Sequence, residues 1–151
     1  MTRYGLPWMG SKSRYARWIL SHIPREPILV DLFAGGCAVT DAALERGQRV
    51  IACDRCAEAL ELFQRTLDVG PPPPPDMPKS NQELRESDLL TRLCWSYGYQ
   101  GSYLASQTPD HNAGASYGAW RAYTHGTAHR EDGCAITQAT RFHTNRRASP
   151  A

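Results

Sequence analysis

A short run of branched apolar residues that ends in two glycines constrains the fold of this chain most strongly. Residues 28–33 read ILVDLF, residues 34–36 read AGG, and a helix-compatible stretch follows over 38–46. Uninterrupted apolar runs of this kind are typical of parallel strands that are buried on both faces. A second run, RVIACD at 49–54, precedes a helical pattern at 57–67. Strands that alternate with helices predict an α/β unit with a parallel sheet.

Two further helices are expected, one before the first strand and one over residues 81–93. The first helix has apolar residues on one face at positions Tyr15, Trp18, Ile19 and Ile23. The second has leucines at positions 84, 89, 90 and 93. Between them, residues 70–79 read GPPPPPDMPK, a composition that excludes helix and central strand and predicts a stiff, extended link.

These changes in composition and apolar periodicity divide the chain into four predicted parts. Residues 1–69 form the α/β part, 70–79 the proline-rich link, 80–107 a second patterned part, and 108–151 an irregular tail with few aliphatic side chains. The length of 151 residues suffices for one buried core, and the net charge of +2 gives no argument for nucleic acid. The sequence shows no membrane span and no secretory signal, so we expect a cytoplasmic protein.

The five cysteines do not predict a disulfide framework or a metal site. Their number is odd and their spacing irregular. Cys53 and Cys56 form half of a zinc-ribbon pattern without a second half, and His125, His129, Cys134 and His143 fit no compact zinc signature. We therefore expect no metal.

The glycine turn after the first strand is the predicted ligand site. Open α/β sheets bind ligands at the carboxyl ends of their strands, where Gly35 and Gly36 allow close approach of a ligand to the backbone. Asp54, at the end of the second strand, is placed to accept hydrogen bonds from ribose hydroxyls. The turn is neither GxGxxG nor a P-loop, so a nucleoside without pyrophosphate, such as S-adenosylmethionine, fits best. The alternative is a tight turn with no ligand.

Three segments together resemble the Dam-type adenine-specific DNA methyltransferases and their phage relatives. The first is Gly10-Ser11-Lys12, the second is DLFAGG at 31–36 with its Asp31, Phe33 and Gly35, and the third is Asp54. The resemblance covers about residues 4–66. This sequence departs from the family pattern at Cys37, where a glycine is usual.

The resemblance implies the N-terminal part of a Rossmann-like, S-adenosylmethionine-dependent methyltransferase fold, followed by an irregular C-terminal segment. It implies that Lys12 borders the methionine moiety, that Phe33 packs at the turn, and that Asp54 holds the ribose. Cys37 is expected to narrow the pocket. The implied cofactor-binding residues are Trp8, Gly10, Lys12, Asp31, Phe33, Gly35 and Asp54.

Beyond residue 80 the resemblance extends to a partial target-recognition segment. Its candidate DNA-binding residues, Tyr97, Tyr99 and Tyr103, alternate with small polar residues and are suited to stacking on bases. A hairpin with aromatic core residues on one face explains the pattern equally well. For the arginines of the tail, solvated surface is the better interpretation.

The family's catalytic tetrapeptide, [DNS]-P-P-[YFW], does not occur in these 151 residues. It holds the exocyclic amine of a base that has been turned out of the duplex. We therefore expect the cofactor-binding part of an enzyme that methylates N6 of adenine in double-stranded DNA, truncated before its catalytic motif and dependent on a second polypeptide. The alternative is a non-catalytic methyltransferase-like module that binds DNA or a protein.

Overall fold

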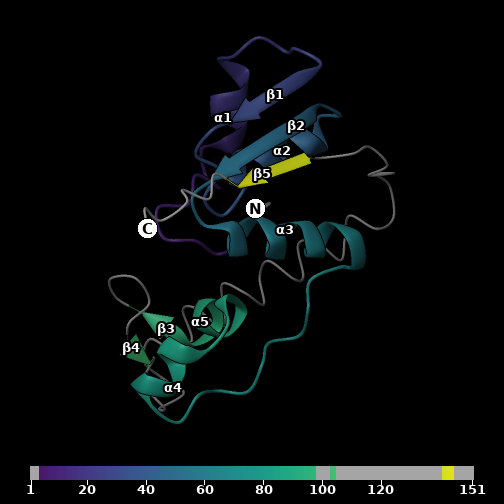
Figure 1. The fold of residues 1–151 in the computed structure, drawn as a ribbon. Helices are drawn as coiled ribbons and strands as arrows, with labels where there is room; N and C mark the ends of the chain where they lie inside the picture. The colour runs from purple at the N-terminus through teal and green to yellow at the C-terminus, as the bar shows by residue number, and fades with distance from the viewer. Residues whose placement is uncertain (1–3, 98–102, 105–140, 145–151) are drawn as a thin grey trace, which may run out of the picture.

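The computed structural model describes residues 4–97, 103–104 and 141–144, and Figure 1 shows their arrangement. Five helices and five strands lie in these residues. The helices are α1 (Ala16–Ser21), α2 (Ala38–Glu45), α3 (Ala57–Val69), α4 (Asn81–Glu86) and α5 (Leu89–Trp95). The strands are β1 (Ile28–Asp31), β2 (Arg49–Asp54), β3 (Ser96–Tyr97), β4 (Tyr103–Leu104) and β5 (Arg141–Thr144).

The expected mixed α/β unit with a parallel sheet is confirmed. The strand order is β1-β2-β5, with β1 parallel to β2 from Ile28 opposite Arg49 to Asp31 opposite Ala52. Strand β5 is parallel to β2 on its other side, although it lies in the segment 108–151 for which the sequence indicates no regular structure. Its four residues, RFHT, gain their hydrogen-bond partners from the edge of β2, and local sequence does not reveal such tertiary pairing.

The helices after β1 and β2 are confirmed, but the one predicted over 81–93 is wrong. It is divided into α4 and α5 at Ser87, whose backbone is extended. Asp88 then begins α5, because its side chain accepts the N–H of Thr91 at 2.8 Å. A side-chain acceptor at this position satisfies an N–H that has no partner inside the helix, which favours a new helix start.

The helix before β1 is also confirmed, but half of its predicted apolar face is wrong: Ile19 and Ile23 are half-buried, and Ile23 packs against the core. Ala16 and Leu20 are fully buried, whereas Tyr15 and Trp18 are exposed. Helix α1 packs against α2 through small residues, and Ala42 and Ala16 belong to the same buried cluster. Close packing of two helices favours the small face of α1 over its aromatic face, and this preference depends on the partner helix.

The two faces of the sheet differ in their covering. Leu29, Val50 and Ala52 face the described helices and belong to the two apolar clusters of the core. On the opposite face of β1, Ile28 is 44% exposed and Val30 is 52% exposed. The prediction that this strand is buried on both faces is therefore wrong for the part of the chain that the structure describes.

The proline-rich residues 70–79 are neither helix nor strand, as predicted. They do not span open solvent, since the indole Nε1–H of Trp95 donates to the carbonyl of Pro75 at 2.8 Å. After α5, β3 and β4 pair in antiparallel fashion, with Tyr97 opposite Tyr103, while Tyr99 lies outside the described residues. Within the described residues, no helix has the length and apolar character needed to cross a membrane.

The burial of the cysteines predicts their order of reaction with a thiol reagent. Cys37 and Cys94 are fully buried, and burial raises the pKa of both thiols, that of Cys94 to about 12. Cys53 and Cys56 are half-buried. In the native protein at pH 8, we expect iodoacetamide to label Cys53 and Cys56 before Cys37 and Cys94, because the thiolate is the reactive form and needs access. Peptide mass mapping reads each site separately, and labelling of Cys37 as fast as Cys53 would contradict the packing.

Candidate functional site

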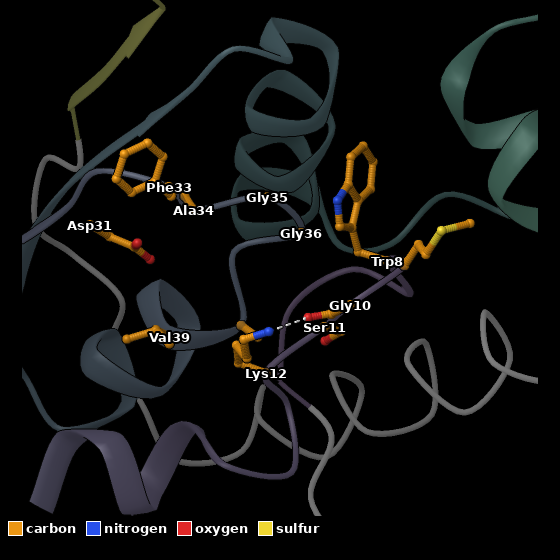
Figure 2. A pocket seen from close by; sticks show the side chains of 12 residues that line it. Trp8, Gly10, Ser11, Lys12, Asp31, Phe33, Ala34, Gly35, Gly36 and Val39 are labelled. Atoms are coloured by element: carbon orange, nitrogen blue, oxygen red, sulfur yellow. Dashed lines mark hydrogen bonds between the residues drawn. The ribbon is translucent and has the colours of Figure 1, made fainter. Parts of the chain in front are cut away.

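A pocket lies at the carboxyl end of β1, between the glycine turn and the N-terminal segment (Figure 2). It has a volume of about 200 Å³. Six of the seven residues that the sequence indicates for cofactor binding line it, namely Trp8, Gly10, Lys12, Asp31, Phe33 and Gly35. The pocket therefore brings together two segments that lie about 20 residues apart in the sequence.

The glycine turn forms one wall of the pocket because it carries no side chains there. A Cβ on Gly36 would lie 2.5 Å from the Cβ of Trp8 and 2.9 Å from the carbonyl oxygen of Leu6. Gly35, with φ +52°, would bring a Cβ to 3.3 Å from the Trp8 indole. Trp8 thus packs directly on the turn, and only glycine fits beneath it.

The N-terminal segment is fixed against α2 by backbone hydrogen bonds. The N–H of Leu6 donates to the Gly36 carbonyl at 2.7 Å, and the N–H of Gly5 donates to Oδ2 of the buried Asp41 at 2.7 Å. A Cβ on Gly5 would lie 2.3 Å from the Gly36 oxygen. Such contacts set the position of Trp8, and with it the width of the pocket.

Asp31 supplies a partly buried carboxylate to the pocket. Burial raises its pKa, while hydrogen bonds from the Thr40 hydroxyl, at 2.8 Å, and from the N–H groups of Phe33 and Thr40 lower it in part. The Asp54 charge raises it further. Because folding raises this pKa, the contribution of Asp31 to stability is greatest below its ordinary pKa and is lost as the pH rises through the raised value.

Lys12 supplies a positive charge from the other segment. Its ammonium donates to the Gly10 carbonyl at 3.0 Å and forms no ion pair within the described residues. Figure 2 shows Lys12 below the glycine turn and Asp31 at the side of the pocket. The site thus offers a cation and a carboxylate to one ligand.

Asp54 does not line the pocket, although the sequence indicates it for ribose binding. Its Oδ2 accepts the N–H of Gly35 at 2.8 Å, and its Oδ1 accepts the N–H of Cys56 at 2.9 Å. It thereby joins the glycine turn to the start of α3. Each carboxylate oxygen still has a second lone pair, so these bonds leave capacity for a further donor.

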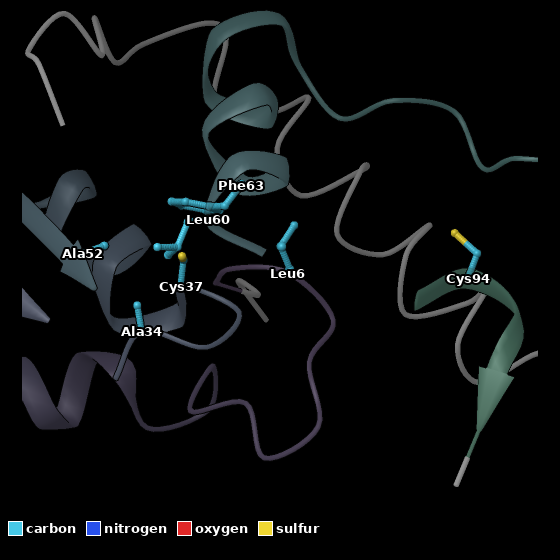
Figure 3. Packing of buried hydrophobic residues seen from close by; sticks show 7 residues of the cluster. All are labelled: Leu6, Ala34, Cys37, Ala52, Leu60, Phe63 and Cys94. Atoms are coloured by element: carbon cyan, nitrogen blue, oxygen red, sulfur yellow. The ribbon is translucent and has the colours of Figure 1, made fainter. Parts of the chain in front are cut away.

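Two expectations about neighbouring side chains are wrong. Phe33 does not pack at the turn but stands at the pocket rim, 90% exposed. Cys37 does not narrow the pocket, since its fully buried side chain lies in the core with Leu60 and Phe63 (Figure 3). The backbone of Cys37 has φ +62°, a conformation in which glycine is favoured and another residue costs about 1 kcal/mol.

Sequence reasoning missed several residues of the site. Those that also line the pocket are Met9, Ser11, Ala34, Ala38 and Val39, whereas Gly36 was predicted as part of the turn. Thr40, whose hydroxyl donates to the Asp31 carboxylate, lies nine residues after Asp31 at the start of α2. The sequence could have indicated Thr40 only as a hydroxyl in the first turn of a helix. Among the described residues, no cluster of potential metal ligands occurs.

Fold and site together define an α/β protein with a pocket at a strand–glycine–helix junction. The chain belongs to the D12 class N6 adenine-specific DNA methyltransferase family, whose sequence model matches residues 8–89, more than half of the 151 residues. This confirms the resemblance drawn from the three motifs. Comparison with curated proteins and with solved structures gave no match. Enzymes of this family act on DNA, so the family points to methyl transfer and to DNA as substrate.

A Cβ at position 36 tests the contact between Trp8 and the turn. We expect Gly36→Ala to destabilise the protein by about 1–3 kcal/mol, because backbone and Trp8 must both shift. Gly47→Ala is the control, since a Cβ there meets open space and only its φ of +76° costs about 1 kcal/mol. Urea denaturation measures both. Because Gly36 has no positive φ, a loss near zero in Gly36→Ala would show that its close approach contributes nothing.

The Thr40 hydroxyl is expected to influence the titration of Asp31. Replacing Thr40 by Val removes a hydrogen bond that favours the charged carboxylate, so the pKa of Asp31 should rise above its already raised value. Carboxyl carbon NMR over a pH series measures it. Thr66→Val, which removes a buried hydroxyl bonded to the Phe63 carbonyl instead, should leave Asp31 unchanged. An unaltered titration in Thr40→Val would disprove the link.

Proposed function

We propose that this chain is the S-adenosylmethionine-binding part of an adenine N6 DNA methyltransferase, built as the N-terminal part of a Rossmann-like fold. The observation that carries the proposal is the gathering of Lys12, Asp31 and the Cβ-free turn around one pocket at the carboxyl end of β1. The family match over residues 8–89 supports it, since methyl transfer requires a methyl donor.

The charges of the pocket suit the amino-acid end of this cofactor. Its carboxylate would lie near the ammonium of Lys12, and its amine would lie near the carboxylate of Asp31. Ala38 and Val39 line the pocket at the start of α2, where N–H groups have no partner inside the helix and favour a negative group. Each charge of the cofactor's zwitterionic amino-acid end would thus lie near a group of opposite charge in the pocket.

The adenosine end would extend beyond the pocket. At about 200 Å³ the pocket is smaller than the roughly 300–1,000 Å³ typical of whole-ligand sites. Asp54, which adjoins the turn through Gly35, would accept ribose hydroxyls with its remaining lone pairs. Phe33, exposed at the rim, provides an apolar surface beside this path.

When bound, S-adenosylmethionine supplies an electrophilic methyl group on its sulfonium. The described residues would orient it, with Trp8 and the glycine turn limiting its movement. The sequence contains no [DNS]-P-P-[YFW] tetrapeptide to hold the target amine. We therefore propose that methyl transfer to double-stranded DNA needs this motif from outside residues 1–151. Tyr97, Tyr99 and Tyr103 remain proposed DNA contacts.

Calorimetric titration with S-adenosylmethionine tests the pocket. We expect the wild-type chain to bind, and Lys12→Met and Asp31→Asn each to weaken binding by about tenfold or more, since each removes one charge that pairs with the zwitterion. Lys79→Met is the matched control, because Lys79 is exposed and lies outside the pocket. Asp54→Ala is less informative, because it also releases the N–H groups of Gly35 and Cys56.

Two outcomes would overturn the proposal. One is absence of binding by a wild-type chain that is folded by circular dichroism. The other is equal binding by Lys12→Met, Asp31→Asn and the control. Binding of duplex DNA that falls steeply with salt and ignores the cofactor would instead favour the non-catalytic module.

A further inference from the structure

Residues 4–13 of the N-terminal segment form a loop whose two ends are joined by a hydrogen bond. The N–H of Tyr4 donates to Oγ of Ser13 at 2.7 Å. Five residues that line the pocket, from Trp8 to Lys12, lie between these two ends. A surface loop whose ends are close together packs compactly, so the contacts at its base position the loop as a unit. The contacts of Tyr4 and Ser13 therefore bear on the pocket, although neither residue lines it.

Tyr4 anchors the base of this loop between α1 and α2. It is 2% exposed and belongs to the same buried cluster as Ala16 of α1 and Ala42 of α2. Its hydroxyl donates to the carboxylate of Glu45 and accepts the Nε–H of Arg17. Burial and the Glu45 carboxylate raise the pKa of Tyr4, so the hydroxyl keeps its proton and remains a donor to Glu45. One side chain thus connects the loop to both helices.

The two ends of the loop are held by different contacts. Residues 5–6 bond to α2 and to the glycine turn, and these bonds place Trp8. Lys12 lies at the other end of the loop, next to Ser13. The bond from the Tyr4 N–H to the Ser13 Oγ brings this second end back to the base. It therefore complements the contacts of residues 5–6 by restricting where Lys12 can lie.

Lys12 has no bond of its own that would fix it against β1. Among the described residues its ammonium donates only to the carbonyl of Gly10, which belongs to the same loop (Figure 2). A further bond inside the loop joins the N–H of Ser13 to Oγ of Ser11 at 3.2 Å. A side chain that is bonded only within its own loop moves with that loop. The position of the Lys12 ammonium relative to the Asp31 carboxylate therefore depends on how the base of the loop is held.

We infer that Tyr4 and Ser13 are positioning residues of the pocket, whose junction at the base of the loop keeps the Lys12 ammonium in a fixed position relative to the Asp31 carboxylate. This role rests on the proposed function, since the ligand that would span the two charges is S-adenosylmethionine. Without the junction, the pocket residues would no longer be held in one arrangement. The ligand would then have to order the loop when it binds, and this ordering lowers its affinity. Tyr4 and Ser13 act through Lys12 and do not touch the ligand.

Calorimetric titration with S-adenosylmethionine tests the junction through three serine variants. Ser13→Ala removes the acceptor of the Tyr4 N–H and should raise the dissociation constant about threefold to tenfold, as the loss of one hydrogen bond does. Ser13→Thr keeps a hydroxyl at this position and should bind as tightly as the wild type. Ser21→Ala is the matched control, because the Ser21 hydroxyl donates to the Trp18 carbonyl on α1, outside the pocket.

A double-mutant cycle distinguishes the positioning of Lys12 from a general loss of stability. In the Lys12→Met background, which lacks the ammonium, Ser13→Ala should change the dissociation constant by less than about twofold. Tyr4→Phe keeps the buried ring but loses the hydroxyl that bonds to both helices, and it should follow the same pattern. Its control is Tyr15→Phe, since Tyr15 is 60% exposed and lies outside the pocket. Effects of equal size with and without the Lys12 ammonium would overturn the inference.

Hydrogen exchange in the absence of cofactor tests the loop separately from the proposed function. The N–H of Ser11 donates to the Trp8 carbonyl at 3.0 Å, and in Ser13→Ala we expect it to exchange faster than in the wild type. The N–H groups within α3 should be unaffected. If the wild-type chain binds no S-adenosylmethionine, the proposed function fails, and the exchange of Ser11 still decides whether the junction orders the loop. Unchanged exchange at Ser11, or equal dissociation constants for Ser13→Ala and Ser21→Ala, would overturn the inference.

Discussion

The pocket depends on one close approach of two backbones, that of residues 5–6 and that of the turn at Gly36. The Leu6 N–H reaches the Gly36 carbonyl at 2.7 Å, and no Cβ fits at Gly5 or Gly36. Asp41 completes the contact by accepting the Gly5 N–H in a buried position. Without this contact Trp8 would not lie over the turn, and the N-terminal segment that carries Lys12 would have no fixed relation to β1. The N-terminal segment and the carboxyl end of β1 form one pocket because their backbones are in contact.

Asp54 shows how a residue proposed to bind ribose can also have a structural role. Its two oxygens hold the glycine turn and the first N–H groups before α3, so the same carboxylate sets the turn's shape and would complete the nucleoside site. Loss of ligand binding on its removal therefore has two physical causes that a single variant cannot separate. The residues that report on the ligand alone are those whose side chains contact little else, and Lys12 is the best of them.

The sequence predicted the elements up to α3 and most of the pocket, because both follow from local patterns. Apolar runs, glycine positions and strand ends specify where β1, α2 and β2 lie, and motif residues come together once the strands are parallel. The features that the sequence did not predict depend on contacts with residues distant in the sequence. Helix α1 buries its small face because α2 is lined with alanines, and β5 forms because β2 has a free side. Cys37 points into the core because its left-handed backbone turns the side chain away from the pocket.

The open face of the sheet follows from the direction in which the chain winds. From β1 through α2 to β2, the chain moves one way across the sheet, and α3 returns to the same face as α2, as the burial of Val50 and Ala52 shows. Right-handed crossovers that continue in one direction keep their helices on one side. Within the described residues, no strand pairs with the outer edge of β1 and its opposite face stays exposed. Covering Ile28 and Val30 would be favourable, because branched residues in a parallel strand gain most of their stabilisation from burial on both faces.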